Sequence, residues 1–292
     1  MDCDVAVLGG GPGGYSAAIR AAQLGASVVC IEKEDALGGT CLRVGCIPTK
    51  AWVQTAHALR EAEETFAKVG VRVPEPQLDF PAAAAWKDAV VKQLTSGVAG
   101  LFKANGVTWV RGLGRFTGPN TIAVEGGEDV TFKHAIVATG SFPVRPPIEG
   151  IDSPRVVDST GLLSVSEVPA RLVVLGGGII GCEFASIFAR FGSQVTIIEM
   201  LPHLIPNEDE EAGQELLKQY KKRGIAVNLE ARCDRIEDTG SSLRVTYNGD
   251  QVVECDLLLV STGRAPLVEG IGLEAAGVAF DRRKGIGADE RR

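Results

Sequence analysis

Two cysteines separated by four residues, Cys41 and Cys46, are the feature of this sequence best suited to chemistry. Cys46 stands two residues before Pro48 and a helical run, and proline favours the first turn of a helix. A thiolate at a helix N-terminus is stabilised by the helix dipole and by backbone N–H groups that lack an intrahelical partner. If Gly45 supplies a bend, Cys41 can turn back towards Cys46. We therefore interpret the pair as a redox-active disulfide.

Two other interpretations of this pair are unrelated cysteines and half of a metal site. The metal site is poorly supported, because no second cluster of cysteine and histidine follows at ligand spacing, and we predict no bound metal. The other five cysteines stand apart. Cys3, Cys30, Cys182 and Cys255 lie in or beside apolar runs that suit small core residues, whereas the surroundings of Cys233 favour no assignment.

A dinucleotide-binding pattern occupies the first 33 residues. An apolar strand leads into Gly9, Gly11 and Gly14, which match G-x-G-x-x-G, and a helix and a second strand follow. Such glycines allow the turn, the approach of a pyrophosphate and close packing of helix on strand, and the helix N-terminus favours the phosphates. Glu32 ends the second strand, where a carboxylate can accept hydrogen bonds from ribose hydroxyls. The pattern predicts a nucleotide site.

The same pattern returns later in the chain. Gly176, Gly178 and Gly181 match the template, and Glu199 follows the next strand. A carboxylate there favours a free 2′-hydroxyl, whereas a 2′-phosphate favours a nearby arginine, and residues 200–203 contain none. The second site is therefore predicted to bind NAD(H) rather than NADP(H).

The duplication predicts an α/β fold with two Rossmann-like dinucleotide-binding domains, each a parallel sheet with helices plus a β-meander. A strand ending in Ala-Thr-Gly at 138–140 has a counterpart ending in Ser-Thr-Gly at 261–263. We place the first domain, with the cysteine pair, at 1–150 and the second at 151–266. Residues 267–292 are predicted to begin a return segment to the first domain.

Composition and charge narrow the class of protein. The chain has 292 residues, 45% of them hydrophobic, which allows two domains. Its net charge of -7 argues against nucleic acid or an anionic membrane surface as a partner. We see no apolar run long enough to span a bilayer and no signal peptide, and so expect a cytoplasmic protein, where a retained disulfide is usually catalytic.

The segment GGTCLRVGCIPTK, the two glycine motifs in this order and the two Thr-Gly strand ends together resemble the class I pyridine nucleotide–disulfide oxidoreductases, and among them most closely the dihydrolipoamide dehydrogenases. The resemblance covers essentially the whole chain. It implies FAD at the first motif and NAD at the second. It also implies a role in cofactor binding for Gly39, Thr40, Thr139, Gly140 and Gly263.

The resemblance further implies roles for four catalytic residues. Cys41 is the interchange thiol that exchanges with the substrate, and Cys46 is the thiol that faces the flavin. Lys50 lies near flavin N5, and Glu183 pairs with it on the nicotinamide side. Electrons then pass from dihydrolipoamide, free or on a lipoyl domain of a 2-oxoacid dehydrogenase complex, through the disulfide and FAD to NAD.

One departure from the family pattern is the end of the sequence. Family members continue with a strand ending in Gly-Asp and with a C-terminal domain that forms the homodimer and supplies a His–Glu acid–base pair. Neither can be matched here, and we expect a chain truncated at its C-terminus. Two alternatives therefore stay open: another family reductase of the glutathione, trypanothione or mercuric type, and a catalytically incomplete nucleotide-binding fragment.

Overall fold

The computed structural model describes residues 1–290. The chain forms two compact units that alternate along the sequence. The first unit comprises residues 1–48, residues 89–142 and the chain from Arg264 onward, and the second comprises residues 49–88 and 143–263. The predicted domain boundaries at 150 and 266, which divide the chain into continuous stretches, stay a prediction.

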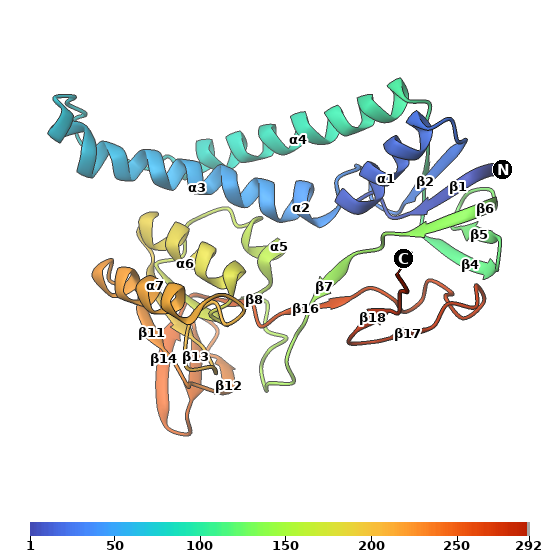
Figure 1. Ribbon diagram of the computed structural model, residues 1–292. Helices are drawn as coiled ribbons and strands as arrows, with labels where there is room; N and C mark the ends of the chain where they lie inside the picture. Colours follow the sequence, from blue (N-terminus) through green and yellow to red (C-terminus); the bar gives the residue numbers. More distant parts are fainter. Residues whose placement is uncertain (291–292) are drawn as a thin grey trace. The chain divides into compact units, whose positions relative to one another are not determined.

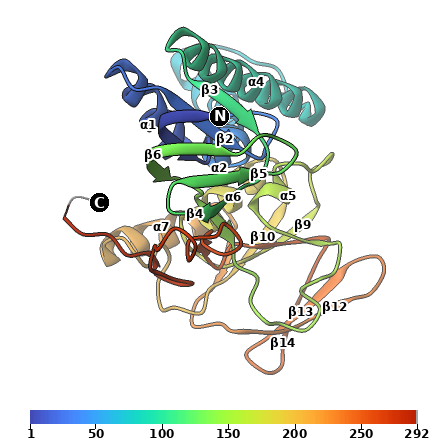
Figure 2. The same ribbon diagram turned by 90° about the vertical axis from the view of Figure 1, so that its right-hand side faces the viewer.

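The first unit is built on a six-stranded sheet with the order β3-β2-β1-β6-β5-β4 (Figures 1 and 2). Strands β3, β2, β1 and β6 pair in parallel, and β5 and β4 continue the sheet as an antiparallel meander. Every residue of β2 is buried, as expected of a parallel strand covered on both faces. The elements are β1 (Asp2–Leu8), α1 (Pro12–Gln23), β2 (Val28–Glu32), α2 (Gly39–Val44), β3 (Thr108–Arg111), β4 (Gly114–Gly118), β5 (Thr121–Val124) and β6 (Val130–Val137).

The second unit contains a five-stranded parallel sheet with the order β11-β10-β9-β15-β8 and a separate antiparallel meander, β12-β13-β14. The predicted fold class, with a parallel sheet and a meander in each half, is confirmed. The elements are β8 (Val156–Val157), α5 (Ser159–Leu162), β9 (Arg171–Leu175), α6 (Ile179–Arg190), β10 (Gln194–Ile198), α7 (Glu210–Lys222), β11 (Ala226–Asn228), β12 (Cys233–Asp238), β13 (Leu243–Tyr247), β14 (Gln251–Cys255) and β15 (Leu257–Val260).

Two long helices each run from one compact unit into the other. They are α3 (Cys46–Arg60) and α4 (Phe80–Ala104), which run side by side in Figure 1. A π-helical turn, η1 (Glu61–Thr65), and a 3-10 turn, η2 (Phe66–Val69), extend α3. Helical structure therefore extends from Cys46 to Val69 and from Phe80 to Ala104.

Within the second unit, an aromatic cluster connects α3 to the start of α4 and to α6. Trp52 of α3 lies 5.4 Å from Phe80 and 5.8 Å from Phe188 of α6, between ring centroids. The buried Lys87 of α4 places its Nζ 5.0 Å from the centre of the Trp52 ring and donates a hydrogen bond to the Leu163 carbonyl at 2.6 Å. Aromatic pairs of this kind contribute about 0.5–1.5 kcal/mol each beyond the area they bury. The cluster therefore fixes α3 against α6.

The last described segment returns to the first unit. Strand β16 (Arg264–Pro266) pairs with β7 (Ser141–Pro143), and β17 (Phe280–Asp281) pairs with β18 (Gly285–Ile286). Ile271 is buried in the core of the first unit, and its carbonyl accepts a hydrogen bond from the Phe116 N–H at 2.8 Å. Residues 291 and 292 of the predicted return segment lie outside the described residues.

Candidate active site

The first glycine turn, residues 9–11, connects β1 to α1 and is called here the first phosphate turn. Gly9 has a φ of +107°, and a side chain on it would collide with the carbonyl oxygen of Ala138. A side chain on Gly14 would collide with the carbonyl of Gly9, so α1 approaches the turn as closely as backbone allows. The first hydrogen bond of α1 runs from the Tyr15 N–H to Gly11, so the earlier N–H groups can face a ligand.

Glu32 braces the first phosphate turn. Its carboxylate is buried and accepts hydrogen bonds from the Gly10 N–H at 2.7 Å and from the Glu34 N–H at 3.0 Å. The Gly10 carbonyl in turn accepts from the Gly38 N–H at 2.8 Å. Both polar groups of Gly10 are therefore held. The sequence predicts a nucleotide contact for Glu32 but does not reveal this bracing role, because the pairing of residues 10 and 32 depends on the tertiary fold.

The second phosphate turn, residues 176–178, repeats these contacts. Each residue has the number of its counterpart in the first turn plus 167, so that Gly176 corresponds to Gly9 and Glu199 to Glu32. Gly176 also has a φ of +107°, and a side chain on Gly181 would collide with its carbonyl. The buried Glu199 accepts from the Gly177 N–H at 2.5 Å and from the Leu201 N–H at 2.7 Å. The duplication therefore extends to individual hydrogen bonds.

The two turns differ in what covers them. Gly39 has a φ of +56°, and a side chain on it would meet the Cα of Gly11 at 2.5 Å. The start of α2 thus lies against the first phosphate turn. Around Gly178, the counterpart of Gly11, a side chain would find nothing within 4 Å. The first turn is closely covered, and the second is open on this side.

The cysteine pair lies at the junction of α2 and α3. Cys41 is half-buried within α2, and Cys46 is exposed and begins α3, as the sequence predicts. A side chain on Gly45 would meet the Thr40 carbonyl oxygen at 2.7 Å and the Cys41 Cα at 3.3 Å. Gly45 therefore allows the chain to fold back on the Thr40–Cys41 peptide. The disulfide itself stays a prediction.

The other cysteines lie in the cores. Burial raises the pKa of Cys30 and Cys255 to about 12 and that of Cys182 and Cys233 to about 11, and it also raises the pKa of Cys3. Such thiols stay protonated at neutral pH and are poor nucleophiles. The structure therefore supports the interpretation of four of them as core residues and adds Cys233 to that set.

The Gly45→Ala variant tests the fold of this junction. We expect the free energy of unfolding to fall by about 1–3 kcal/mol, because the Thr40 carbonyl must move to make room. Disulfide formation between the two cysteines should slow at least about tenfold, since the chain can no longer fold back as closely. Thiol titration during controlled oxidation measures that rate.

The matched control is Gly100→Ala, on α4, where a side chain would meet nothing within 4 Å. Alanine is the better helix former, so this variant should gain about 0.5–1 kcal/mol and leave the oxidation rate as it is. Oxidation of Gly45→Ala at the parent rate would contradict the role given to Gly45.

Lys50 and Glu183 form an ion pair between α3 and α6 of the second unit. Their side chains are 56% and 33% exposed, so the pair contributes little to stability. On α3, Lys50 stands one turn beyond Cys46. The structure thus joins two residues 133 positions apart that the sequence could link only through the family resemblance.

The two Thr-Gly strand ends lie in equivalent positions. In each, the carbonyl of the residue before the threonine lies next to the first glycine of a phosphate turn. Gly140 and Gly263 have φ values of +74° and +133°. The Thr139 hydroxyl donates to the Leu267 carbonyl at 2.7 Å, a structural contact that ties β6 to the return segment. The roles of Thr139, Gly140 and Gly263 in cofactor binding stay predictions.

The sequence profile of the pyridine nucleotide-disulphide oxidoreductase family matches residues 3–292. The chain belongs to this family. It is 43% identical over 297 residues to dihydrolipoyl dehydrogenase 1, mitochondrial, of Arabidopsis thaliana, covering 99% of this chain and 59% of that protein. It is 40% identical to dihydrolipoyl dehydrogenase of Geobacillus stearothermophilus, over all of this chain and 63% of that protein.

Among solved structures, the chain is similar to the Cu(II) complex of HOCl-induced flavoprotein disulfide reductase RclA from Escherichia coli. The TM-score is 0.88 at 32% identity, and the match covers 100% of this chain and 63% of that one. The chain therefore spans about three fifths of the length of these family members.

Within residues 1–290, no three His, Cys, Asp or Glu side chains are grouped so that they could hold a metal ion. None of the described helices combines the length and the hydrophobicity that a membrane-spanning segment needs.

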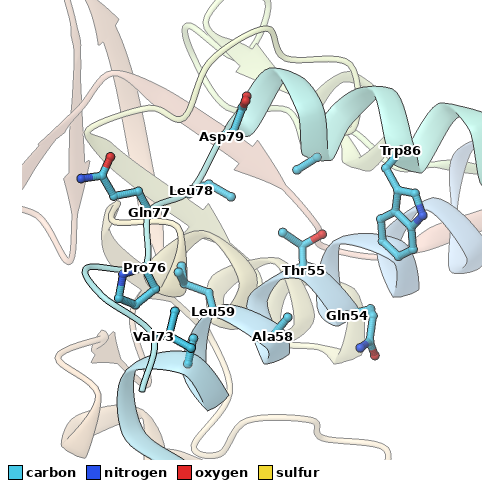
Figure 3. Close-up of a pocket in the computed structure, with 12 residues that line it drawn as sticks. Gln54, Thr55, Ala58, Leu59, Val73, Pro76, Gln77, Leu78, Asp79 and Trp86 are labelled. Atoms are coloured by element: carbon cyan, nitrogen blue, oxygen red, sulfur yellow. The ribbon is translucent and has the colours of Figure 1, made fainter. Parts of the chain in front are cut away.

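Two of the cavities in the described part of the chain lie in the second unit. One, of about 590 Å³, lies between α3 and α4 and is mainly apolar, with Leu59, Leu78 and Trp86 on its wall (Figure 3). It contains none of the predicted site residues. The other, of about 840 Å³, lies among α3, α6 and α7 and includes Glu183. The second is therefore the cavity that borders the candidate site.

Proposed function

We propose that this chain is the nucleotide- and disulfide-bearing part of a flavin-dependent oxidoreductase that transfers electrons from dihydrolipoamide to NAD. The observation that carries the proposal is the position of the cysteine pair. Gly39 packs on Gly11 of the first phosphate turn, and Cys41 follows two residues later on the same short helix. A thiol pair next to a dinucleotide turn suits exchange of electrons between sulfur and a redox cofactor.

The residues of the first phosphate turn fit FAD. Its glycines leave room for a pyrophosphate, and the N-terminus of α1 offers backbone N–H groups and a favourable dipole. The cover that Gly39 provides suits a cofactor that stays bound between turnovers. When bound, FAD supplies the two-electron carrier between the dithiol and the pyridine nucleotide.

The residues of the second phosphate turn fit NAD. The open side at Gly178 suits a nucleotide that enters and leaves in each cycle. Glu199 directly follows β10 beside the turn, and the next residue, Met200, is 66% exposed and carries no charge. With no arginine at 200–203 to bind a 2′-phosphate, NAD is the better match than NADP.

The thiol chemistry balances with the residues present. One thiolate of dihydrolipoamide attacks Cys41 Sγ of the disulfide, which breaks the Cys41–Cys46 bond and releases Cys46 as a thiolate. The second substrate thiol then displaces Cys41, so lipoamide leaves as a cyclic disulfide and both cysteines are reduced. Re-formation of the Cys41–Cys46 bond then gives up two electrons, which leave with one proton on NADH, and the other proton goes to solvent. Cys46 is the first residue of α3, and the N-terminal end of a helix dipole favours negative charge.

Lys50 and Glu183 are proposed to act on the nicotinamide side. Each holds the other in place across α3 and α6, so the ammonium group is oriented without being deeply buried. A fixed positive charge there would favour electron-rich states of a bound flavin ring. We further infer a homodimer as the working assembly and a reducing compartment such as the cytoplasm as its location, in keeping with a dithiol that must be regenerated.

A second candidate is reduction of another disulfide with NADH as donor. It is favoured by the similarity to the flavoprotein disulfide reductase RclA, which extends over the whole chain. The same groups would then work in the opposite direction, with NADH oxidised and the substrate disulfide reduced.

The test is anaerobic mixing of the FAD-loaded chain with dihydrolipoamide, followed by NAD. We expect the flavin colour to bleach on adding the dithiol and NADH to form on adding NAD. NADP should support at least about tenfold less product, because Glu199 repels a 2′-phosphate. Bleaching by NADH but not by dihydrolipoamide would favour the second candidate, and a chain that retains no flavin would contradict the cofactor assignment.

A further inference from the structure

Ile205 has a backbone conformation that its side chain disfavours. Its φ is +46°, and among the four non-glycine residues with positive φ in the described chain it alone is β-branched. Such a residue is a genuine outlier in this region of backbone space, and strain of this kind persists only where the surroundings enforce it. The Ile205 N–H donates to the Gly177 carbonyl at 2.8 Å. The strain is therefore located at the second phosphate turn.

The first half of the chain shows that the backbone contact needs no side chain. At the position numbered 167 lower stands Gly38, with a φ of +123°, and its N–H donates to the Gly10 carbonyl at the same 2.8 Å. Glycine adopts positive φ without a steric penalty. Because glycine makes this contact in the first half, the backbone hydrogen bond alone does not require an isoleucine at this position.

This backbone contact sets the direction of the turn. The Glu199 carboxylate holds the Gly177 N–H and the Ile205 N–H holds the Gly177 carbonyl. A trans peptide unit is planar, with its C=O and N–H on opposite sides. Fixing the Gly177 carbonyl therefore directs the Gly178 N–H the other way, and a side chain at Gly178 would find open space.

The Ile205 side chain lies beside the start of α6. It is half-buried, packs partly on the core around α6 and α7, and lines the 840 Å³ cavity together with Ile179, Cys182 and Glu183. Ile179, the first residue of α6, is 52% exposed. Two isoleucines thus border the helix start next to the Glu183 carboxylate, and apolar walls strengthen nearby N–H to phosphate interactions by excluding water.

We propose that Ile205 is a positioning residue for the pyridine dinucleotide, whose side chain forms the apolar wall of the second phosphate turn at the expense of backbone strain. The proposal rests on the proposed function of this turn. It predicts that the residue determines affinity for the nucleotide more than stability of the fold.

The experiment measures NADH binding to the full chain by calorimetry, together with the melting temperature, for the parent and for Ile205→Gly and Ile205→Val. We expect Ile205→Gly to bind about tenfold more weakly, as expected for loss of a half-buried isoleucine side chain. Its melting temperature should change by only a few degrees, since relief of strain offsets the lost packing. Ile205→Val keeps most of the wall and should lie between the parent and Ile205→Gly in affinity.

Asn248→Gly is the matched control, because Asn248 has nearly the same φ, +47°, on the turn that joins β13 and β14. It should change stability and leave NADH binding unchanged. Equal NADH affinity in the parent and Ile205→Gly overturns the inference while sparing the proposed function, as does an affinity loss matched by a collapse in melting temperature. No NADH binding by the folded parent overturns both.

Discussion

Replacing Cys46 by serine should reduce the rate at which dihydrolipoamide bleaches the FAD-loaded chain by at least about 1,000-fold, the scale of loss seen when a covalent catalytic group is removed. A serine cannot form the disulfide, so the substrate has no bond to exchange with. The variant should still fold, because Cys46 is exposed at the start of α3. Stopped-flow absorbance under anaerobic conditions measures the rate.

The two cysteines should differ once each is replaced alone. Cys41→Ser keeps the Cys46 sulfur at the N-terminus of α3, so it should show a long-wavelength absorption band from contact of that sulfur with flavin. Cys46→Ser should lack the band. Cys3→Ala, in the core of the first unit, is the control and should react at the parent rate. A Cys46→Ser variant with parental kinetics would refute the disulfide mechanism.

Much of the fold follows from local patterns in the sequence. The glycine motifs, the strand before each and the acid after the next strand are all short-range, so they predict both parallel sheets and both phosphate turns. The start of α3 at Cys46 follows in the same way from Pro48.

Contacts between distant residues could not be predicted by such patterns. The bond from Gly10 to Glu32, the packing of Gly39 on Gly11 and the Lys50–Glu183 pair all join segments whose approach depends on the tertiary fold. The strained backbone of Ile205 could not be predicted either, because no residue type at 204–208 indicates a positive φ. The 167-residue repeat is the one signal that could have found it, since Gly38 occupies the equivalent place.

Replacing the first glycine of either phosphate turn should weaken the binding of one cofactor and leave the binding of the other unchanged. Gly9→Ala should lose FAD while the second unit still binds NADH, and Gly176→Ala should do the reverse. Each alanine combines an unfavourable positive φ with a collision against a backbone carbonyl, of Ala138 or of Ser261. A combined cost of about 3 kcal/mol or more corresponds to at least about 100-fold weaker binding.

Gly25→Ala distinguishes strain from collision. Gly25 follows α1 with a φ of +94°, and a side chain there would meet nothing within 4 Å. Its alanine should cost about 1–2 kcal/mol of stability from backbone strain alone and leave both nucleotides bound. Flavin absorbance after gel filtration and calorimetry with NADH report the two sites independently. If Gly176→Ala released FAD and kept NADH, the assignment of the two turns would have to be exchanged, because each collision is confined to its own turn.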